Sequence, residues 1–175
     1  MTAASTYMLV FRILHVAAGV AWAGSVFLFV VLVQPSAGAI GPAASPFMME
    51  LLGRRKLVSW LLSLAGTTIV AGIFLYAKLA DDMGLSDFVS SGFGLALTIG
   101  AVAAIVAFGI GLFGTRPSVA RLLALAAQAA AADGPPPPEV AQEIPRVQAR
   151  LKNLGRIAFA FIVVAVLTMA TARYW

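Results

Sequence analysis

Long uninterrupted apolar stretches are the feature that most limits the folds open to this chain. Four segments of 16 to 26 residues hold almost no charged side chain, and they cover residues 8–33, 57–77, 95–113 and 157–172. A helix needs about 20 apolar residues to cross the roughly 30 Å hydrocarbon core of a bilayer. We therefore expect four transmembrane helices within a single integral membrane domain that covers residues 1–175.

The composition excludes a water-soluble fold. Apolar and aromatic residues make up 61% of the chain, and Asp, Glu, Lys and Arg together make up 11%. A typical soluble domain carries about 25% charged residues, because it must cover its surface with polar groups. Cysteine is absent, which excludes zinc-thiolate sites, iron–sulfur clusters and covalently attached c-type haem.

The placement of basic residues predicts the orientation in the membrane. The connection at residues 34–56 holds three Lys or Arg and that at 115–156 holds six, whereas 78–94 holds only Lys78 beside three Asp. Because basic loops remain in the cytoplasm, we expect both termini on the outer side of a bacterial-type inner membrane. The net charge of +5 thus follows from basic residues beside apolar spans, and no nucleic-acid partner is expected.

The third connection is predicted to be helical. Residues 118–132 are rich in Ala and Leu, which favour helix. Asp133, Gly134 and a run of four prolines then break the chain, and helical spacing resumes at residues 139–153. The expected fold is therefore all-α, a four-helix transmembrane bundle in which helices 3 and 4 extend as a cytoplasmic helical hairpin at about 116–156.

Small residues recur along the third span at helical spacing. They form one stripe, made of Gly100, Ala104, Ala107, Gly111 and Gly114. In lipid, such stripes mark faces where helices approach closely. The stripe favours packing within the bundle, and it is also compatible with a homodimer interface or a seat for a flat cofactor.

His15 is an ionisable residue inside the first span. It lies about seven residues, or roughly 10 Å, from the outer end. Arg12 is one turn above it on the helix, and Gly19 and Trp22 are one and two turns below. An ionisable residue within the membrane indicates a functional site by default. The structural alternative is a neutral histidine that hydrogen-bonds a neighbouring helix.

A b-type haem is the cofactor that this arrangement favours. It needs a strong axial nitrogen, an apolar slot and cations for its propionates; His15 supplies the nitrogen and Gly19 the room. Met169 is a candidate sixth ligand at a similar depth, although a lone methionine in an apolar helix more often only packs. The candidate propionate partners at the outer membrane surface are Arg12, Lys78 and Arg173. No acidic residue lies within the spans, which argues against proton relays and aspartyl proteolysis, and no catalytic residue is assigned.

The segment Arg12–Gly24, RILHVAAGVAWAG, followed by Gln34-Pro35, resembles a known membrane motif. It is similar to the first helix of the copper-resistance D (CopD-like) proteins and of the membrane-bound, haem-containing protoporphyrinogen oxidases. The C-terminal MATARYW resembles the ending of uncharacterised four-helix proteins that share this pattern. The resemblance implies that His15 is a haem ligand or metal-site residue, with Trp22 in the packing motif.

Three functional hypotheses follow. The first is a haem-b protein with a redox or electron-transfer role. The second is an accessory or structural subunit of a larger membrane complex, and the third is a protein that handles copper or another small ion. The lipid bilayer is the expected partner in each, together with a second copy of the chain or other membrane subunits.

Overall fold

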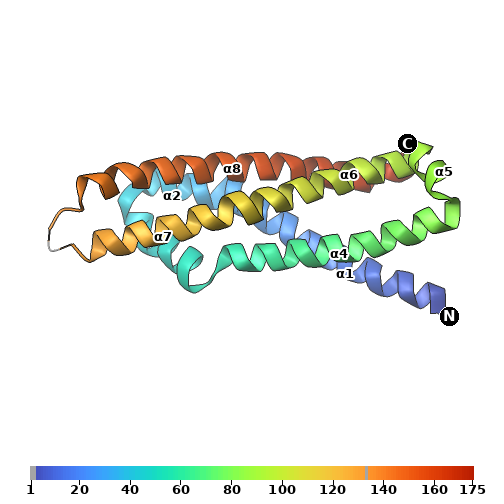
Figure 1. The fold of residues 1–175 in the computed structure, drawn as a ribbon, viewed down its shortest axis with the longest axis horizontal. Helices are drawn as coiled ribbons and strands as arrows, with labels where there is room; N and C mark the ends of the chain where they lie inside the picture. The colour runs from blue at the N-terminus through green and yellow to red at the C-terminus, as the bar shows by residue number, and fades with distance from the viewer. Residues whose placement is uncertain (1–2, 133) are drawn as a thin grey trace.

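The chain forms an elongated bundle of long helices. The computed structural model describes residues 3–132 and 134–175, and within them it contains helices and no strand. The start of helix α1 (Ala3–Leu28) and the C-terminus lie at one end of the bundle, and the C-terminal end of α7 (Arg116–Ala130) and the start of α8 (Pro138–Thr171) lie at the other (Figure 1). Four helical segments are long and apolar enough to cross a membrane, namely Thr6–Arg54, Leu57–Met83, Gly92–Ala130 and Pro138–Tyr174. The predicted all-α fold with four membrane-crossing helices is confirmed.

The first helical segment continues well past the apolar span. Helix α1 (Ala3–Leu28) passes through a π-helical turn, η1 (Phe29–Val33), into α2 (Gln34–Ile40). Pro35 lies in the first turn of α2, where a residue without an N–H is tolerated. Gly41, with φ of 71°, ends α2. Three short elements then reverse the chain: η2 (Gly41–Ala44), α3 (Ser45–Met49) and the π-helical η3 (Glu50–Arg54).

The second helix, α4 (Leu57–Met83), begins at a sharp turn. Lys56 precedes it in the left-handed conformation, with φ of 51°. The helix extends beyond the predicted end at Ala77 to Met83, and Gly84 (φ 82°) leads into the short helix α5 (Leu85–Ser90). Ser91 then caps α6 (Gly92–Gly109), because its Oγ accepts the N–H of Gly94 at 3.0 Å.

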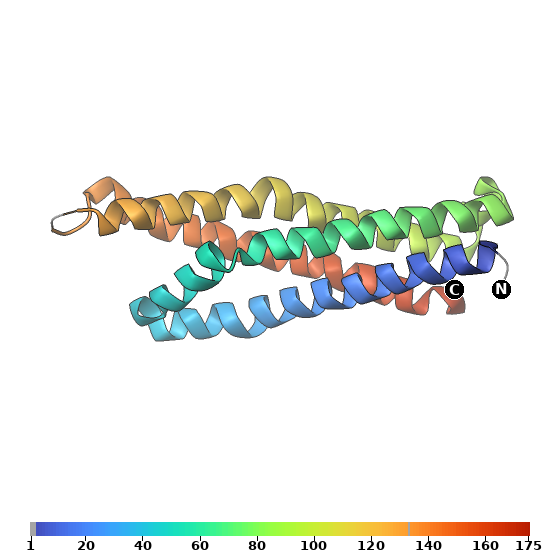
Figure 2. The same cartoon turned by 90° about the horizontal axis from the view of Figure 1, so that it is seen from below.

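The hairpin predicted at about 116–156 is present. Helix α6 continues through the π-helical η4 (Ile110–Thr115) into α7 (Arg116–Ala130). The chain returns along α8 (Pro138–Thr171), which ends in the short η5 (Ala172–Tyr174), so α7 and α8 lie side by side (Figures 1 and 2). Pro138 lies in the first turn of α8 and Pro145 inside it. Asp133, at the predicted break, lies outside the described residues.

The two antiparallel helix pairs with the most extensive contact are α1 with α4 and α6 with α8. The pairs meet at a small core, made of Trp22, Ala65, Ala103, Ala104, Ala107, Ile162 and Ala165. The small-residue stripe of the third span packs within the chain: Ala104 and Ala107 belong to the core, and an added Cβ at Gly111 would lie 3.2 Å from Leu62 Cδ2. Small side chains thus permit close helix approach.

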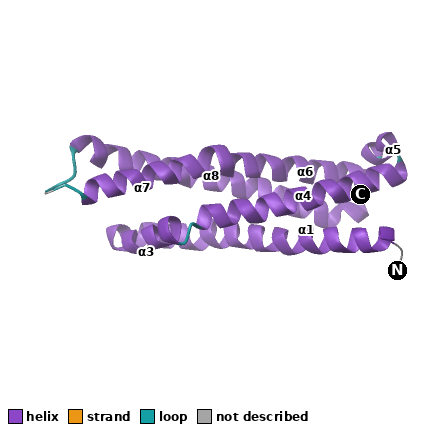
Figure 3. Ribbon diagram, turned by 60° about the horizontal axis from the view of Figure 1, so that its bottom comes forward, coloured by secondary structure: helices purple, strands orange, loops and turns teal. Residues whose placement is uncertain are grey.

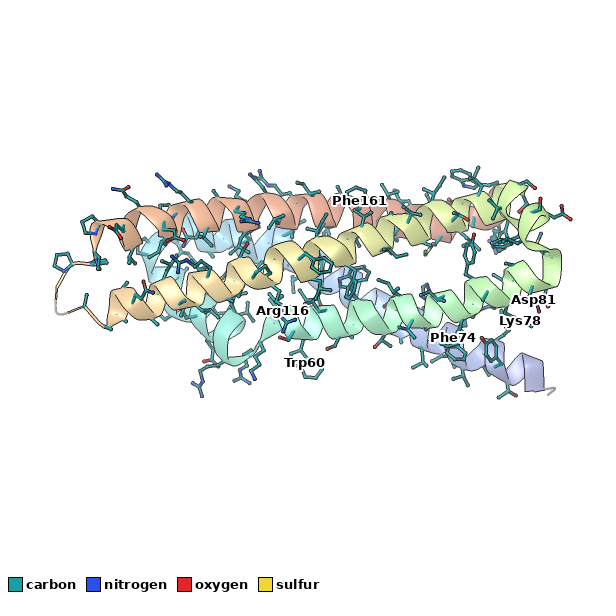
Figure 4. The ribbon with its side chains drawn as sticks, viewed as in Figure 1. Trp60, Phe74, Lys78, Asp81, Arg116 and Phe161 are labelled. Carbon is teal, nitrogen blue, oxygen red and sulfur yellow. The ribbon has the colours of Figure 1, made fainter. Side chains whose placement is uncertain are left out.

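Many large apolar side chains are exposed on the outside of the bundle. Val20 is 67% exposed, and Trp60 is 66% exposed and points away from the bundle (Figure 4). Many residues of this kind cover the outside of the crossing segments. A surface this apolar is stable in lipid and would aggregate in water, which makes the protein an integral membrane protein.

An ion pair joins the two arms of the hairpin. Arg121 of α7 donates from Nε and Nη2 to the two carboxylate oxygens of Glu143 of α8, at 2.7 and 2.6 Å. This hydrogen bond lowers the pKa of the Glu143 carboxyl below its ordinary value. The stabilisation is therefore present at neutral pH, and it is lost as the pH falls through the lowered pKa of the folded state.

We expect Glu143→Gln to loosen the hairpin at neutral pH. Amide hydrogen exchange of α7 and the start of α8 should rise modestly, because the pair is solvent-exposed. The difference from wild type should shrink as the pH falls through the lowered pKa of Glu143, because the wild-type carboxyl is then itself protonated. Glu139→Gln, which removes a nearby exposed carboxylate with no ion pair among the described residues, is the control. Equal exchange in both variants at pH 7 would contradict this role.

Candidate functional site

His15 lies in the contact between α1 and α4. Its Nδ1 is 2.8 Å from the backbone carbonyl oxygen of Thr68. Because a carbonyl oxygen only accepts hydrogen bonds, Nδ1 donates to it, and in the neutral form of the ring Nε2 then keeps a free lone pair. Gly72 makes this approach possible, since a Cβ there would lie 3.0 Å from both Cε1 and Nδ1 of His15.

Nε2 of His15 is available for a further interaction. The ring makes its hydrogen bond through Nδ1 alone. Among the residues that the structure describes, no buried side-chain nitrogen or oxygen lacks a hydrogen-bond partner, so this unpaired Nε2 is not fully enclosed. An unprotonated imidazole nitrogen is a good metal ligand, and metal-bound histidines commonly donate their other N–H to a carbonyl.

Gly19 and Trp22 support the helix contact next to His15. A Cβ at Gly19 would lie 3.3 Å from Cγ2 of Thr68, so the methyl group of Thr68 fills the space that the sequence suggested for a haem ring. Trp22 is 7% exposed and belongs to the core shared by the helix pairs. His15 and Gly19 therefore converge on one residue of α4, Thr68.

The three basic residues proposed as propionate partners differ in their surroundings. Arg12 is exposed, one turn from His15 on α1. Lys78, at the end of α4, binds Asp82 and lies 3.8 Å from Asp81 (Figure 4). Arg173 donates to the hydroxyl of Tyr174 and lies 4.5 Å from the centre of its ring. Lys78 is thus already neutralised by carboxylates, whereas among the described residues neither Arg12 nor Arg173 forms an ion pair.

Met169 lies on the other helix pair. A Cβ at Gly100 of α6 would be 2.7 Å from Cγ and 3.1 Å from Cε of Met169, so the thioether lies along α6. This is the packing role that a lone methionine in an apolar helix usually has. To reach iron at His15, the side chain would have to leave this position.

Thr68 and Gly72 are the site residues that sequence reasoning missed. They are four residues apart on α4, so they share one helix face. Two small residues at this spacing are a signal for close helix approach, and the pattern was visible in the sequence. The pattern alone does not identify α1 as the helix that packs against this face of α4.

The side chains that could bind a metal ion limit the kinds of metal site that this chain can form. Within residues 3–132 and 134–175, no group of three or more His, Cys, Asp or Glu side chains is placed to hold a metal ion. A b-type haem makes a smaller demand, since the porphyrin supplies four nitrogens and the protein one or two axial ligands. His15 fits the ligand part of this demand through its oriented ring and its Nε2, whereas the space beside Gly19 is occupied by Thr68, so a porphyrin ring would have to lie elsewhere around His15.

No protein-family model, curated protein or solved structure matches the chain. The class of protein therefore follows from the fold and from its lipid-facing surface. It is an all-α integral membrane protein with four membrane-crossing helices.

Proposed function

We propose that the protein binds a b-type haem through Nε2 of His15 and has an electron-transfer role in a bacterial-type inner membrane. The hydrogen bond between Nδ1 of His15 and Thr68 O carries this proposal. It holds the ring in one orientation and in the tautomer that leaves Nε2 as a Lewis base. When bound, haem supplies a one-electron redox centre.

The chain's own residues would orient the ligand and neutralise the cofactor's acid groups. The carbonyl of Thr68 makes the imidazole a stronger donor by accepting its N–H, and Gly72 gives the ring access to that carbonyl. Arg12 is exposed and one turn from His15, and it would pair with a propionate. Arg173 is the second cation proposed for this role.

The proposal has two forms, which differ in the residue that would be the second ligand to the haem iron. In one form, Met169 of the same chain would be the second ligand, after leaving its contact with Gly100. In the other form, the second ligand would come from a second copy of the chain or from another membrane subunit. The two forms differ in stoichiometry, because a haem shared between two copies gives one haem for two chains.

Titration of detergent-purified protein with haemin tests both forms. A Soret band that saturates at a defined stoichiometry is the expected result. If Met169 is a ligand, Met169→Leu should shift the visible spectrum without removing haem, because leucine has no sulfur. An unshifted spectrum at one haem for two chains would assign the second ligand to a partner chain. Absence of saturable binding would contradict the proposal.

We also propose that residues 115–156 lie in the cytoplasm and that both termini lie outside. The natural chain has no cysteine, so Asp82→Cys and Ala132→Cys each create a unique thiol. In intact cells, a membrane-impermeant maleimide should modify the cysteine at position 82 and spare that at position 132. Both should react after the cells are opened. Labelling at position 132 alone would reverse the orientation.

A further inference from the structure

A large cavity lies between the helices at the end of the bundle opposite the termini. Its volume is about 1040 Å³, and all four helical segments contribute to its walls. Core residues close it toward the middle of the bundle, namely Trp22, Ala65, Ala107 and Ile162. Figure 2 shows the segment with α2 and α3 diverging from the α7–α8 hairpin at this end, and Figure 3 shows α3 apart from α7.

The three π-helical segments of the structure all contribute to this cavity. Phe29 and Val30 come from η1, Leu52 from η3, and Gly111 and Thr115 from η4. A π-helical turn shifts the side chains that follow it around the helix axis. Such turns are rare in proteins, and those that occur are often found at functional sites. Their coincidence at one cavity indicates a binding site.

The walls are mainly apolar, with a basic edge on α8. Lys152 and Arg156 line the cavity one turn apart, and both are exposed. Among the described residues, neither forms an ion pair, whereas Arg121 is paired with Glu143. The long apolar part of α8 begins directly after Arg156, at Ile157. This places the two cations where lipid headgroups meet hydrocarbon.

We propose that this cavity binds one anionic phospholipid. Its phosphate lies at Lys152 and Arg156, and its acyl chains lie against the apolar walls. The volume is at the upper limit of the roughly 300–1,000 Å³ that ligand sites occupy. Two unpaired cations complement a phosphate, and a neutral amphiphile would leave them without a counter-charge. The site is separate from His15, which does not line the cavity.

The charge requirement is tested by native mass spectrometry of detergent-purified protein with added phosphatidylglycerol or phosphatidylcholine. One phosphatidylglycerol should stay bound, in preference to phosphatidylcholine. The double variant Lys152→Gln/Arg156→Gln should bind it roughly tenfold or more weakly. Arg146→Gln/Arg150→Gln, with the same change of charge on exposed positions of α8 outside the cavity, should bind it like wild type. Equal weakening in both double variants, or no preference for phosphatidylglycerol, overturns the proposal.

The volume requirement is tested by filling the cavity from α8. Ala158 lines it, whereas Ala160 is exposed on the same helix and does not. Ala158→Trp should displace the bound lipid and Ala160→Trp should retain it, with circular dichroism showing that both are folded. Equal retention in two folded variants overturns the proposal, as does a bound neutral isoprenoid in place of the phospholipid. If Ala158→Trp does not fold, the charge variants decide.

Discussion

Replacement of His15 by alanine should abolish the Soret band of the protein while leaving the chain in the membrane. The variant loses the imidazole that we propose as the axial ligand. It also loses the hydrogen bond to Thr68 O. Hydrogen bonds between membrane helices contribute about 0.6 kcal/mol on average, so the loss of haem should be complete whereas the loss of stability should be modest. Haem content per chain and the thermal unfolding of the apoprotein measure the two effects separately.

His15→Gln is the matched variant for this experiment. Its side-chain amide can donate to the carbonyl of Thr68, as Nδ1 of His15 does, but it has no imidazole nitrogen for iron. We expect it to recover part of the thermal stability that His15→Ala loses and to bind no haem. Wild-type haem content in both variants would exclude His15 as the ligand. Recovered stability with no haem in any variant, wild type included, would leave His15 as an interhelical hydrogen-bonding residue.

Gly94→Ala should cause a large loss of stability. A Cβ at Gly94 would lie 1.8 Å from the carbonyl oxygen and 2.6 Å from the carbonyl carbon of Phe88. These are backbone atoms, so the turn between α5 and α6 would have to open. Phe88 is fully buried and makes an edge-on contact with Tyr76 at 4.9 Å. We expect a cost of about 3 kcal/mol or more, measured as a lowered unfolding temperature in detergent.

Gly109→Ala is the control, because it is the same substitution at the other end of α6. Apart from its two chain neighbours and the backbone of its own helix, nothing lies within 4 Å of a Cβ at Gly109. Alanine favours helix over glycine by up to about 1 kcal/mol, so this variant should be as stable as wild type or slightly more stable. If the two variants unfold at the same temperature, the close approach of α6 to Phe88 is wrong.

The sequence predicts the overall fold well because the signals are local. Apolar length identifies the four crossing helices, and the prolines near Pro135 mark the turn of the hairpin. The helix boundaries are harder to predict. The helix of the first span continues past Val33 through η1 and α2, and α4 continues past Ala77. Hydropathy reports where side chains become polar, whereas a helix ends where its backbone turns, as at Gly41 and Gly84.

The site is predicted less completely, because its geometry depends on how helices pair. The sequence singles out His15 by its charge type in an apolar span. It does not show that the backbone carbonyl of Thr68 accepts a hydrogen bond from Nδ1 of His15, or that the side chain of Thr68 fills the space beside Gly19. Met169 likewise matches His15 in depth but packs on Gly100 in the other helix pair. The depth of a residue in the membrane can be counted along its own helix. Whether two residues on different helices are close depends on how those helices pair and in which register.

The most direct test of the proposed function is a reduced-minus-oxidised absorption spectrum of wild-type protein, purified after expression with ample haem. We expect the Soret and α-band changes of a b-type haem, with haem extractable into acidified organic solvent because no cysteine can hold it covalently. One haem per chain, or one per two chains, agrees with ligation by His15. Colourless protein with no difference spectrum would contradict the haem proposal.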